Sequence, residues 1–296
     1  MKNILIIGAN GFTGRRILND LSVNPIYHVT GCSLRDDICP GKDYRFVRTD
    51  IRDENEVRKL FKECRPDIVI NTSALSVPDY CETHHAEAEA TNVTAVETIA
   101  HVCEQYGSRF IHLSTDFVFD GKSTRLYKEE DEAITVNYYG VTKLKAEKII
   151  ASICSNYAIV RVVVVYGKAL PGQHGNILQL VANRLRNGET IRVVSDQWRT
   201  PTFVGDISVG VEKLMFHTAN GIYHICGSEC LTIAEIAYRV ADFLKLDRSL
   251  IEPVTTEEMK EVTPRPRFSG LSIEKAKAEI GYTPRTLEEG MEASLF

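Results

Sequence analysis

Long hydrophobic runs and an excess of basic charge are both missing from this 296-residue sequence. No stretch approaches the ~20 apolar residues that a membrane-spanning helix needs. The short apolar run at the N-terminus passes straight into a glycine turn, which is not the pattern of a signal peptide. The net charge is −5 and no strongly basic run occurs, which argues against a nucleic-acid surface. We therefore expect a cytoplasmic protein with no membrane and no nucleic-acid partner.

Cysteines in recognisable pairs are missing as well. The eight cysteines are scattered, none forms Cys-x-x-Cys, and no histidine follows them at zinc-finger spacing. This usage is typical of reduced thiols in a cytosolic protein, many of them buried as small hydrophobic side chains. We predict no metal site. The composition, 44% hydrophobic and 25% charged, is ordinary for a globular protein.

The first chemical signal is a strand followed by a glycine-rich turn. Residues 3–7 form a continuous apolar run, typical of a strand buried on both faces of a parallel sheet. The turn contains Gly8, Gly11 and Gly14 and leads into a helical pattern. Glycines there allow a pyrophosphate to approach backbone N–H groups at a helix N-terminus. The turn therefore predicts phosphate binding, with a plain strand-to-helix turn as the alternative.

The end of the second expected strand indicates which dinucleotide is preferred. A site for NAD usually has an acidic residue at this position, to bind the ribose 2′-hydroxyl. The sequence has Ser33 and Arg35 instead, which suit a 2′-phosphate, and no acidic residue before Asp36. This favours NADP(H), with NAD(H) as the second choice. The alternative is that Arg35 is a solvated loop residue.

The rest of the chain alternates strand-like apolar runs with helical patterns. Such alternation predicts an α/β fold, a Rossmann-type doubly wound parallel sheet with a smaller C-terminal substrate-binding lobe. We expect strands near 46–49, 67–71, 110–113 and 157–167, helices near 53–64 and 84–106, and a further helix in the stretch 137–147. The dinucleotide-binding domain is expected to cover 1–167 and to be re-entered at about 196–225, with 168–195 and 226–296 forming the lobe.

Tyr139 and Lys143 are the candidate catalytic pair. They lie at i and i+4, which places both side chains on one helix face. A neighbouring ammonium favours the phenolate and lowers the pKa of a tyrosine toward the working pH, which suits proton transfer to a carbonyl. Thr115 ends a strand, where its hydroxyl can bond to a substrate oxygen. The alternatives are an ordinary amphipathic helix and an ordinary strand-end turn.

Several strings along the chain resemble one superfamily. The glycine turn, STDFVFDG (114–121), YGVTKLKAE (139–147), DQWRTPTFVGD (196–206) and RPRFSGLS (265–272) are similar to the extended short-chain dehydrogenases/reductases, and within them to the dTDP-4-dehydrorhamnose reductases. The resemblance implies that Tyr139 gives a proton to the 4-keto oxygen of a nucleotide sugar. It implies that Lys143 lowers the tyrosine pKa and holds the nicotinamide ribose, while Thr115 bonds to the carbonyl.

The same resemblance implies two further sets of residues. Those expected at the cofactor, together with Tyr139 and Lys143, are Gly8, Asn10, Gly11, Phe12, Thr13, Gly14, Ser33, Arg35, Asp50, Ile51, Ser73, Ala74, Leu75 and Asn92. Asp50 can accept from the adenine amino group or can instead cap the helix that follows. Those expected at the substrate are Val77, Thr115, Asp116, Phe117, Asn176 and Arg265.

The chain departs from the reductase pattern at three places. Phe117 stands where tyrosine is usual, Val164 where tryptophan is usual, and Trp198-Arg199 where a smaller pair is common. Two other functions therefore stay open. One is an NADP-binding regulatory subunit, as the methionine adenosyltransferase β subunit is, and the other is a nucleotide-sugar epimerase. A dehydratase is disfavoured because no glutamate follows Asp116. The expected partners are a nucleotide sugar and a second copy of the chain in a homodimer.

Overall fold

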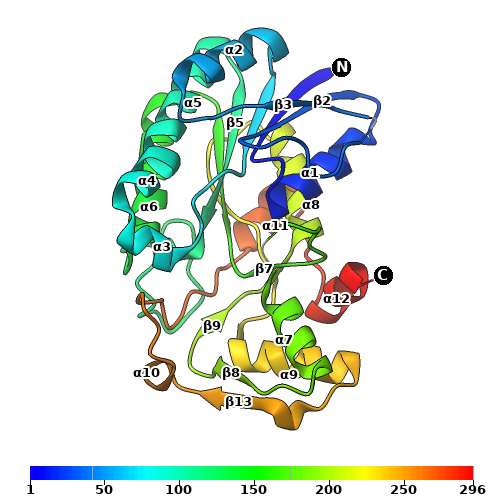
Figure 1. Ribbon diagram of the computed structural model, residues 1–296. Coiled ribbons are helices and arrows are strands. Elements are labelled where there is room, and N and C mark those ends of the chain that lie inside the picture. Colours follow the sequence, from blue (N-terminus) through cyan, green and yellow to red (C-terminus); the bar gives the residue numbers. More distant parts are fainter. Residues whose placement is uncertain (42, 174, 296) are drawn as a thin grey trace.

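A parallel sheet is the centre of the computed structural model, which describes residues 1–41, 43–173 and 175–295 (Figure 1). The strand order is β11-β6-β5-β4-β1-β2-β3, and every neighbouring pair runs parallel. The order reverses between β1 and β4, which makes the carboxyl ends of these two strands the expected ligand crevice. The strands are β1 (Lys2–Ile7), β2 (Tyr27–Ser33), β3 (Arg45–Arg48), β4 (Ile68–Asn71), β5 (Arg109–Thr115), β6 (Tyr157–Val162) and β11 (Gly221–His224).

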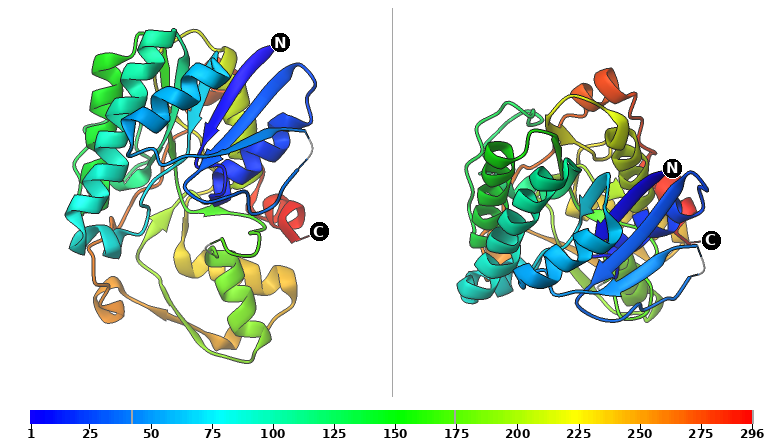
Figure 2. Two further views of the ribbon diagram at one scale, coloured as in Figure 1. Left: turned by 45° about the horizontal axis from the view of Figure 1, so that its top comes forward. Right: turned by 90° about the horizontal axis from the view of Figure 1, so that it is seen from above.

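Side chains on alternate faces of the strands build two hydrophobic layers. In β1, Ile4 and Ile6 belong to one core, whereas Leu5 and Ile7 belong to the other. The first core is covered by α1 (Phe12–Ser22), α8 (Val204–Phe216) and α11 (Glu274–Ile280), and the second by α2 (Glu54–Cys64), α5 (Ala95–Tyr106) and α6 (Tyr138–Ile153). Figure 2 shows the sheet between these two sets of helices. The predicted doubly wound α/β fold is confirmed.

A smaller lobe lies beyond the carboxyl ends of the strands, at the bottom of Figure 1. It has its own core, to which Val181 of α7 and Val240 of α9 belong, both almost fully buried. Strand β11 and helix α8 return to the central sheet from this part of the chain, and α11 lies against it. The lobe elements are α7 (Ile177–Arg186), β8 (Ile191–Val194), α9 (Ile233–Leu244), β13 (Ile251–Val254) and α10 (Thr256–Met259); β8 and β13 pair in parallel.

Short elements join the lobe to the sheet. Strand β9 (Trp198–Arg199) pairs with β12 (Leu231–Thr232), and the 3₁₀ turn η2 (Asp116–Val118) follows β5. Helix α12 (Leu287–Leu295) contributes Leu287 and Met291 to the lobe core. None of the helices in the described ranges combines the length and apolar character that crossing a bilayer requires.

Two elements differ from the expectations drawn from the sequence. The helix predicted at 84–106 is divided into α4 (His85–Glu89), a π-helical turn η1 (Ala90–Thr94) and α5, after a separate helix α3 (Pro78–Thr83). The strand predicted at 157–167 ends at Val162, because Val164 adopts a φ of 37°. The chain there leaves the central sheet, and β7 (Val165–Tyr166) pairs with β10 (Thr202–Phe203). The apolar composition of residues 157–167 did not reveal that this part of the chain changes its strand-pairing partner.

Candidate active site

The glycine turn after β1 is packed too closely for side chains. Gly8 has a φ of +82°, and a Cβ there would lie 2.7 Å from the backbone nitrogen of Ser73, which follows β4. A Cβ on Gly14 would lie 2.3 Å from the carbonyl oxygen of Gly8. Gly11 is the N-cap of α1 and has no side chain to bond the first N–H groups of the helix. This turn therefore fits a pyrophosphate at the helix N-terminus.

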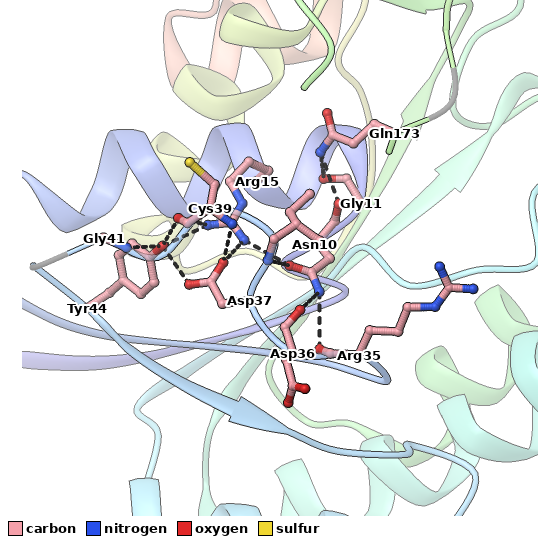
Figure 3. A network of polar contacts seen from close by, with 11 residues as sticks. Asn10, Gly11, Arg15, Arg35, Asp36, Asp37, Cys39, Gly41, Tyr44 and Gln173 are labelled. Atoms are coloured by element: carbon pink, nitrogen blue, oxygen red, sulfur yellow. Dashed lines mark hydrogen bonds and ion pairs between the residues drawn. The ribbon is translucent and has the colours of Figure 1, made fainter. Parts of the chain in front are cut away.

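Asn10 organises the loop that follows β2, as Figure 3 shows. Its Nδ2 donates to the carbonyl oxygens of Arg35 (3.2 Å) and Asp36 (2.9 Å), and its Oδ1 accepts from Arg15 Nη2 (2.9 Å). Arg15 is buried and also pairs with Asp37. The side chain of Asn10 is thus engaged by protein groups, and it holds the loop after β2 in place.

Arg35 is free to reach a ligand beside this network. Its carbonyl oxygen is fixed by Asn10, whereas its exposed guanidinium extends away from the network in Figure 3. Ser33 ends β2, and its carbonyl oxygen accepts from Thr49 N at 2.9 Å, so its half-buried side chain has a fixed backbone. The two residues stay candidates for a 2′-phosphate.

The predicted adenine residues lie at the end of β3. Arg52 donates to both carboxylate oxygens of Asp50, and this hydrogen bonding is the main cause that lowers the Asp50 pKa. The alternative that Asp50 caps the next helix is wrong, because Asp53 is the N-cap of α2 and accepts from Asn55 N at 2.8 Å. Ile51 is half-buried against the core between the sheet and α2.

The segment after β4 is held by Asn92 from the π-helical turn. Asn92 Oδ1 accepts from Leu75 N at 2.8 Å, and its Nδ2 donates to Leu75 O at 3.0 Å and to Thr142 Oγ1 of α6 at 3.0 Å. Ser73 donates to Asn71 through both its N–H and its hydroxyl. Asn92 therefore connects the segment that contains Ser73, Ala74 and Leu75 to α6 and fixes the backbone of this segment at Leu75.

Tyr139 lies beside Thr115 and Phe117 because α6 approaches η2 very closely. Asn137 caps α6 by accepting from Gly140 N at 2.9 Å, which sets where the helix begins. The rings of Phe117 and Tyr139 meet edge to face with centroids 6.0 Å apart. Burial raises the pKa of the Tyr139 phenol, and the hydrogen bond with Thr115 only partly opposes this. The structure thus brings the predicted proton donor and the predicted threonine together.

Lys143 is buried one turn further along α6. Its Nζ donates to the carbonyl oxygen of Leu113 at 2.6 Å and lies 2.9 Å from Nε2 of His112, and only 2% of the residue is exposed. Burial lowers its pKa to about 8, although Glu147 acts in the opposite direction. In the ligand-free protein burial raises the pKa of the Tyr139 phenol, so the expected lowering by Lys143 stays a prediction for the site with its ligands bound.

His112 is a site residue that the sequence reasoning missed. It is fully buried in β5, between Lys143 and Asn71, and its Nδ1 lies 3.1 Å from Asn71 Nδ2. The available signal was a histidine inside an otherwise apolar strand, three residues before Thr115. A buried histidine must find polar partners, and here the partners are a catalytic candidate and the end of β4.

A cavity of about 540 Å³ opens between the Tyr139 region and the lobe. Phe117 lines it and its ring meets the Tyr139 ring edge to face, so one side chain separates the cavity from the candidate catalytic group. Arg265 also lines it and lies 3.2 Å from a carboxylate oxygen of Glu261. Other lining residues, which the sequence reasoning did not single out, are Asp79, Ile177, Leu180, Ile191, Arg192, Val193, Val194, Gln197, Ile233, Met259, Lys260 and Val262.

The remaining predicted substrate residues have structural partners. Asn176 forms a capping box at the start of α7 and donates to Gly167 O at 2.8 Å. Asp116 is buried and accepts from Thr115 Oγ1 at 3.1 Å and from Ser269 Oγ, with Arg199 Nε 3.7 Å away. Val77 is the exposed N-cap of α3. Of the three departures, Phe117, Val164 and Arg199 all lie at the cavity.

The parallel sheet and the glycine turn after its first strand have the fold of an extended short-chain dehydrogenase/reductase. More specifically, the chain belongs to the RmlD substrate-binding domain family, which matches residues 1–295.

Individual relatives are similar over nearly the whole chain. The spore coat polysaccharide biosynthesis protein SpsK of Bacillus subtilis is 31% identical, with 98% of this chain and 96% of that protein covered. The methionine adenosyltransferase 2 subunit beta of Xenopus laevis is 31% identical, with 96% and 84% covered. The crystal structure of dTDP-4-dehydrorhamnose reductase from Bacillus anthracis in complex with NADP has a TM-score of 0.87 at 26% identity, with 99% of each chain covered.

Proposed function

We propose that the protein catalyses the NADPH-dependent reduction of the 4-keto group of a nucleotide-activated 6-deoxy sugar. The observation that carries this proposal is the position of Tyr139, which lies beside Thr115 and whose ring meets that of Phe117 in the cavity wall. A phenol and a hydroxyl beside a substrate cavity can bond to the same carbonyl oxygen. The likeness to a dTDP-4-dehydrorhamnose reductase supports the sugar assignment.

The cofactor residues fit NADP(H). The N-terminus of α1, open at Gly11, would receive the pyrophosphate, and the exposed Arg35 with Ser33 would receive a 2′-phosphate. Asp50 and Ile51 would contact the adenine, and the segment from Ser73 to Leu75 would border the dinucleotide. When bound, the reduced nicotinamide supplies the hydride. The NADP complex of the Bacillus anthracis reductase supports this choice.

The chain's own groups then handle the oxygen and its proton. The Thr115 hydroxyl bonds to the substrate carbonyl and orients it, and Tyr139 donates its proton as negative charge develops on that oxygen. A buried ammonium on Lys143 would stabilise the resulting phenolate, because charges act strongly in a site with little water. Phe117 excludes water from one side of the phenol.

The cavity suits a nucleotide sugar. Most of its lining is apolar, which fits a base and a deoxygenated sugar, and Arg192, Lys260 and Arg265 supply positive charge for a diphosphate. The test is oxidation of NADPH by the purified protein with dTDP-4-keto-6-deoxy-L-mannose and with its uridine analogue. Consumption of NADPH that depends on the sugar supports the proposal. Tight NADPH binding with no consumption for any nucleotide keto-sugar contradicts it.

A second candidate function is that of an NADP-binding regulatory subunit. The similarity to the methionine adenosyltransferase 2 subunit beta, over 96% of this chain, favours it. The two functions differ in what they need from Tyr139. A subunit that only binds a dinucleotide needs no proton donor, so binding without turnover, together with a stable complex with a partner enzyme, would support this second function.

A further inference from the structure

Asn71 has only one possible orientation of its side-chain amide. The backbone N–H of Ser73 donates to Asn71 Oδ1 at 3.0 Å, and the Ser73 hydroxyl donates to the same oxygen at 2.6 Å. A backbone N–H cannot accept, so the atom facing it must be the amide oxygen. The amide nitrogen of Asn71 is therefore the atom that faces His112, and an amide nitrogen can only donate.

This orientation determines where the proton of His112 lies. Asn71 Nδ2 lies 3.1 Å from His112 Nδ1, so Nδ1 must be the accepting nitrogen without a hydrogen. The imidazole is completely buried, and burial lowers its pKa well below the ordinary value, so the ring is neutral. A neutral ring with a bare Nδ1 carries its hydrogen on Nε2, and Nε2 is the atom 2.9 Å from Lys143 Nζ.

A donor on His112 requires an acceptor on Lys143. An ammonium group has three donors and no lone pair, whereas an uncharged amine can accept one hydrogen bond and still donate two. One donor of Nζ goes to the carbonyl oxygen of Leu113 at 2.6 Å. We propose that His112 is a positioning residue that favours the uncharged amine form of Lys143 in the ligand-free protein, so that the lysine takes up its proton more readily once a ligand offers Nζ another acceptor.

The charged groups around Lys143 are consistent with this proposal. Glu147 is one turn further along α6, but its two carboxylate oxygens are bound by Arg161 of β6 at 3.0 and 2.7 Å. Asp116 of η2 is bound by Thr115 and Ser269 and faces Arg199. Within the described ranges, no carboxylate lies within ion-pair distance of Nζ.

The thiol and the phenol near α6 add no charge either. Burial raises the pKa of the Cys81 thiol of α3 to about 11, so it is uncharged near neutral pH. Burial is also the largest cause of the raised pKa of the Tyr139 phenol. Both groups are therefore uncharged before the ligands arrive, and the phenol is ready to donate its proton.

The experiment measures Lys143 in the free protein, so it depends on neither NADPH binding nor turnover. The lysine side chains are labelled with ¹³C at Cε and titrated by NMR, and the Lys143 signal is identified by its loss in Lys143→Arg. We expect this signal to titrate near pH 8, well below the exposed lysines. Titration of Lys143 together with the exposed lysines would overturn the proposal and leave the proposed function untouched.

One substitution exchanges the donor and acceptor roles of the two ring nitrogens of His112 and keeps the histidine. In Asn71→Asp a carboxylate accepts from His112 Nδ1–H, so Nε2 becomes an acceptor and suits a lysine ammonium. The Lys143 midpoint should rise by about two pH units toward the ordinary lysine value. Asn183→Asp, which makes the same charge change on the exposed face of α7, should leave it unchanged. An unchanged midpoint in folded Asn71→Asp would also overturn the proposal.

A second measurement needs no substitution at all. The ¹⁵N signals of His112 in the wild-type protein report which ring nitrogen carries the hydrogen. We expect a protonated Nε2 and a bare Nδ1, and the opposite tautomer would overturn the proposal even if Asn71→Asp did not fold.

Discussion

The carbonyl oxygen of Phe117 lies so close to Gly140 that a Cβ added to the glycine would sit 2.2 Å from it. This contact lets the first turn of α6 approach η2, which brings Tyr139 to Thr115 and to the cavity. The absence of a side chain at one position is therefore what assembles the candidate site.

The substitution Gly140→Ala tests the importance of this close approach. The new methyl group must push α6 away from Phe117, so we expect a loss of about 1–3 kcal/mol of stability and a larger loss of turnover than the stability change explains. Gly175→Ala is the matched control, since its Cβ would meet only a flexible glutamine side chain at an ordinary 3.5 Å. Equal effects of the two substitutions on urea unfolding and NADPH oxidation would refute the packing argument.

A second prediction concerns the buried ion pair of Glu147 and Arg161. Their side chains are only 3% and 2% exposed, so removing one charge leaves the other without a partner. Glu147→Gln should cost about 3–5 kcal/mol in the free energy of unfolding. Glu54→Gln breaks an exposed pair with Arg58 and should cost less than about 1 kcal/mol. Urea denaturation measures both, and a small cost for Glu147→Gln would contradict the prediction.

A third prediction is a loss of stability in acid that depends on His224. Burial, reinforced by the charge of Arg161, lowers the pKa of this imidazole to about 3 from its ordinary 6.5. Below pH 6.5 the unfolded chain binds a proton that the folded chain does not, so stability is complete above 6.5 and falls as the pH drops toward 3. Each such histidine contributes a slope of about 1.4 kcal/mol per pH unit.

Replacing His224 separates its contribution from that of His112, whose pKa is lowered in the same direction. In His224→Gln the free energy of unfolding should fall less steeply below pH 6.5. The slope should be smaller by about 1.4 kcal/mol per pH unit, which is the contribution of one proton. Unfolding in urea at several pH values measures this. Parallel curves for the two proteins would show that His224 is not protonated preferentially in the unfolded state.

A fourth prediction concerns the choice of dinucleotide. Arg35→Ala should weaken NADPH binding about tenfold or more and leave NADH binding nearly unchanged, because only NADPH has the 2′-phosphate. Arg58→Ala removes an exposed guanidinium on α2 and serves as the control. Dissociation constants from fluorescence titration measure both effects. An equal loss of affinity for NADPH and NADH would mean that Arg35 does not bind the 2′-phosphate.

The sequence predicted β1 and β4 well because these strands are continuous apolar runs whose burial extends over both faces, but it did not predict β11 at the edge of the sheet. It did not predict where the sixth strand leaves the sheet, since Val164 is as apolar as its neighbours and its φ of 37° precedes a pairing with the distant strand β10. Nor did it show the π-helical turn at Asn92, which depends on bonds to Leu75 and Thr142 from distant elements.

The candidate site was predictable in its residues but not in its electrostatics. The i, i+4 spacing placed Tyr139 and Lys143 on one helix face, and the strand end placed Thr115 nearby. The direction of the Tyr139 pKa shift could not be obtained, because burial by side chains of other elements is its largest cause. His112 has no fixed spacing from Lys143, so only the packing of β5 against α6 reveals the contact.

The central claim, that Tyr139 is the proton donor in a reductase, is tested most directly by Tyr139→Phe. NADPH oxidation is measured with dTDP-4-keto-6-deoxy-L-mannose for the variant and the wild type, together with the dissociation constant for NADPH. We predict that turnover falls by about 10²–10⁴-fold while NADPH affinity changes little. A variant that oxidises NADPH at the wild-type rate would contradict the account.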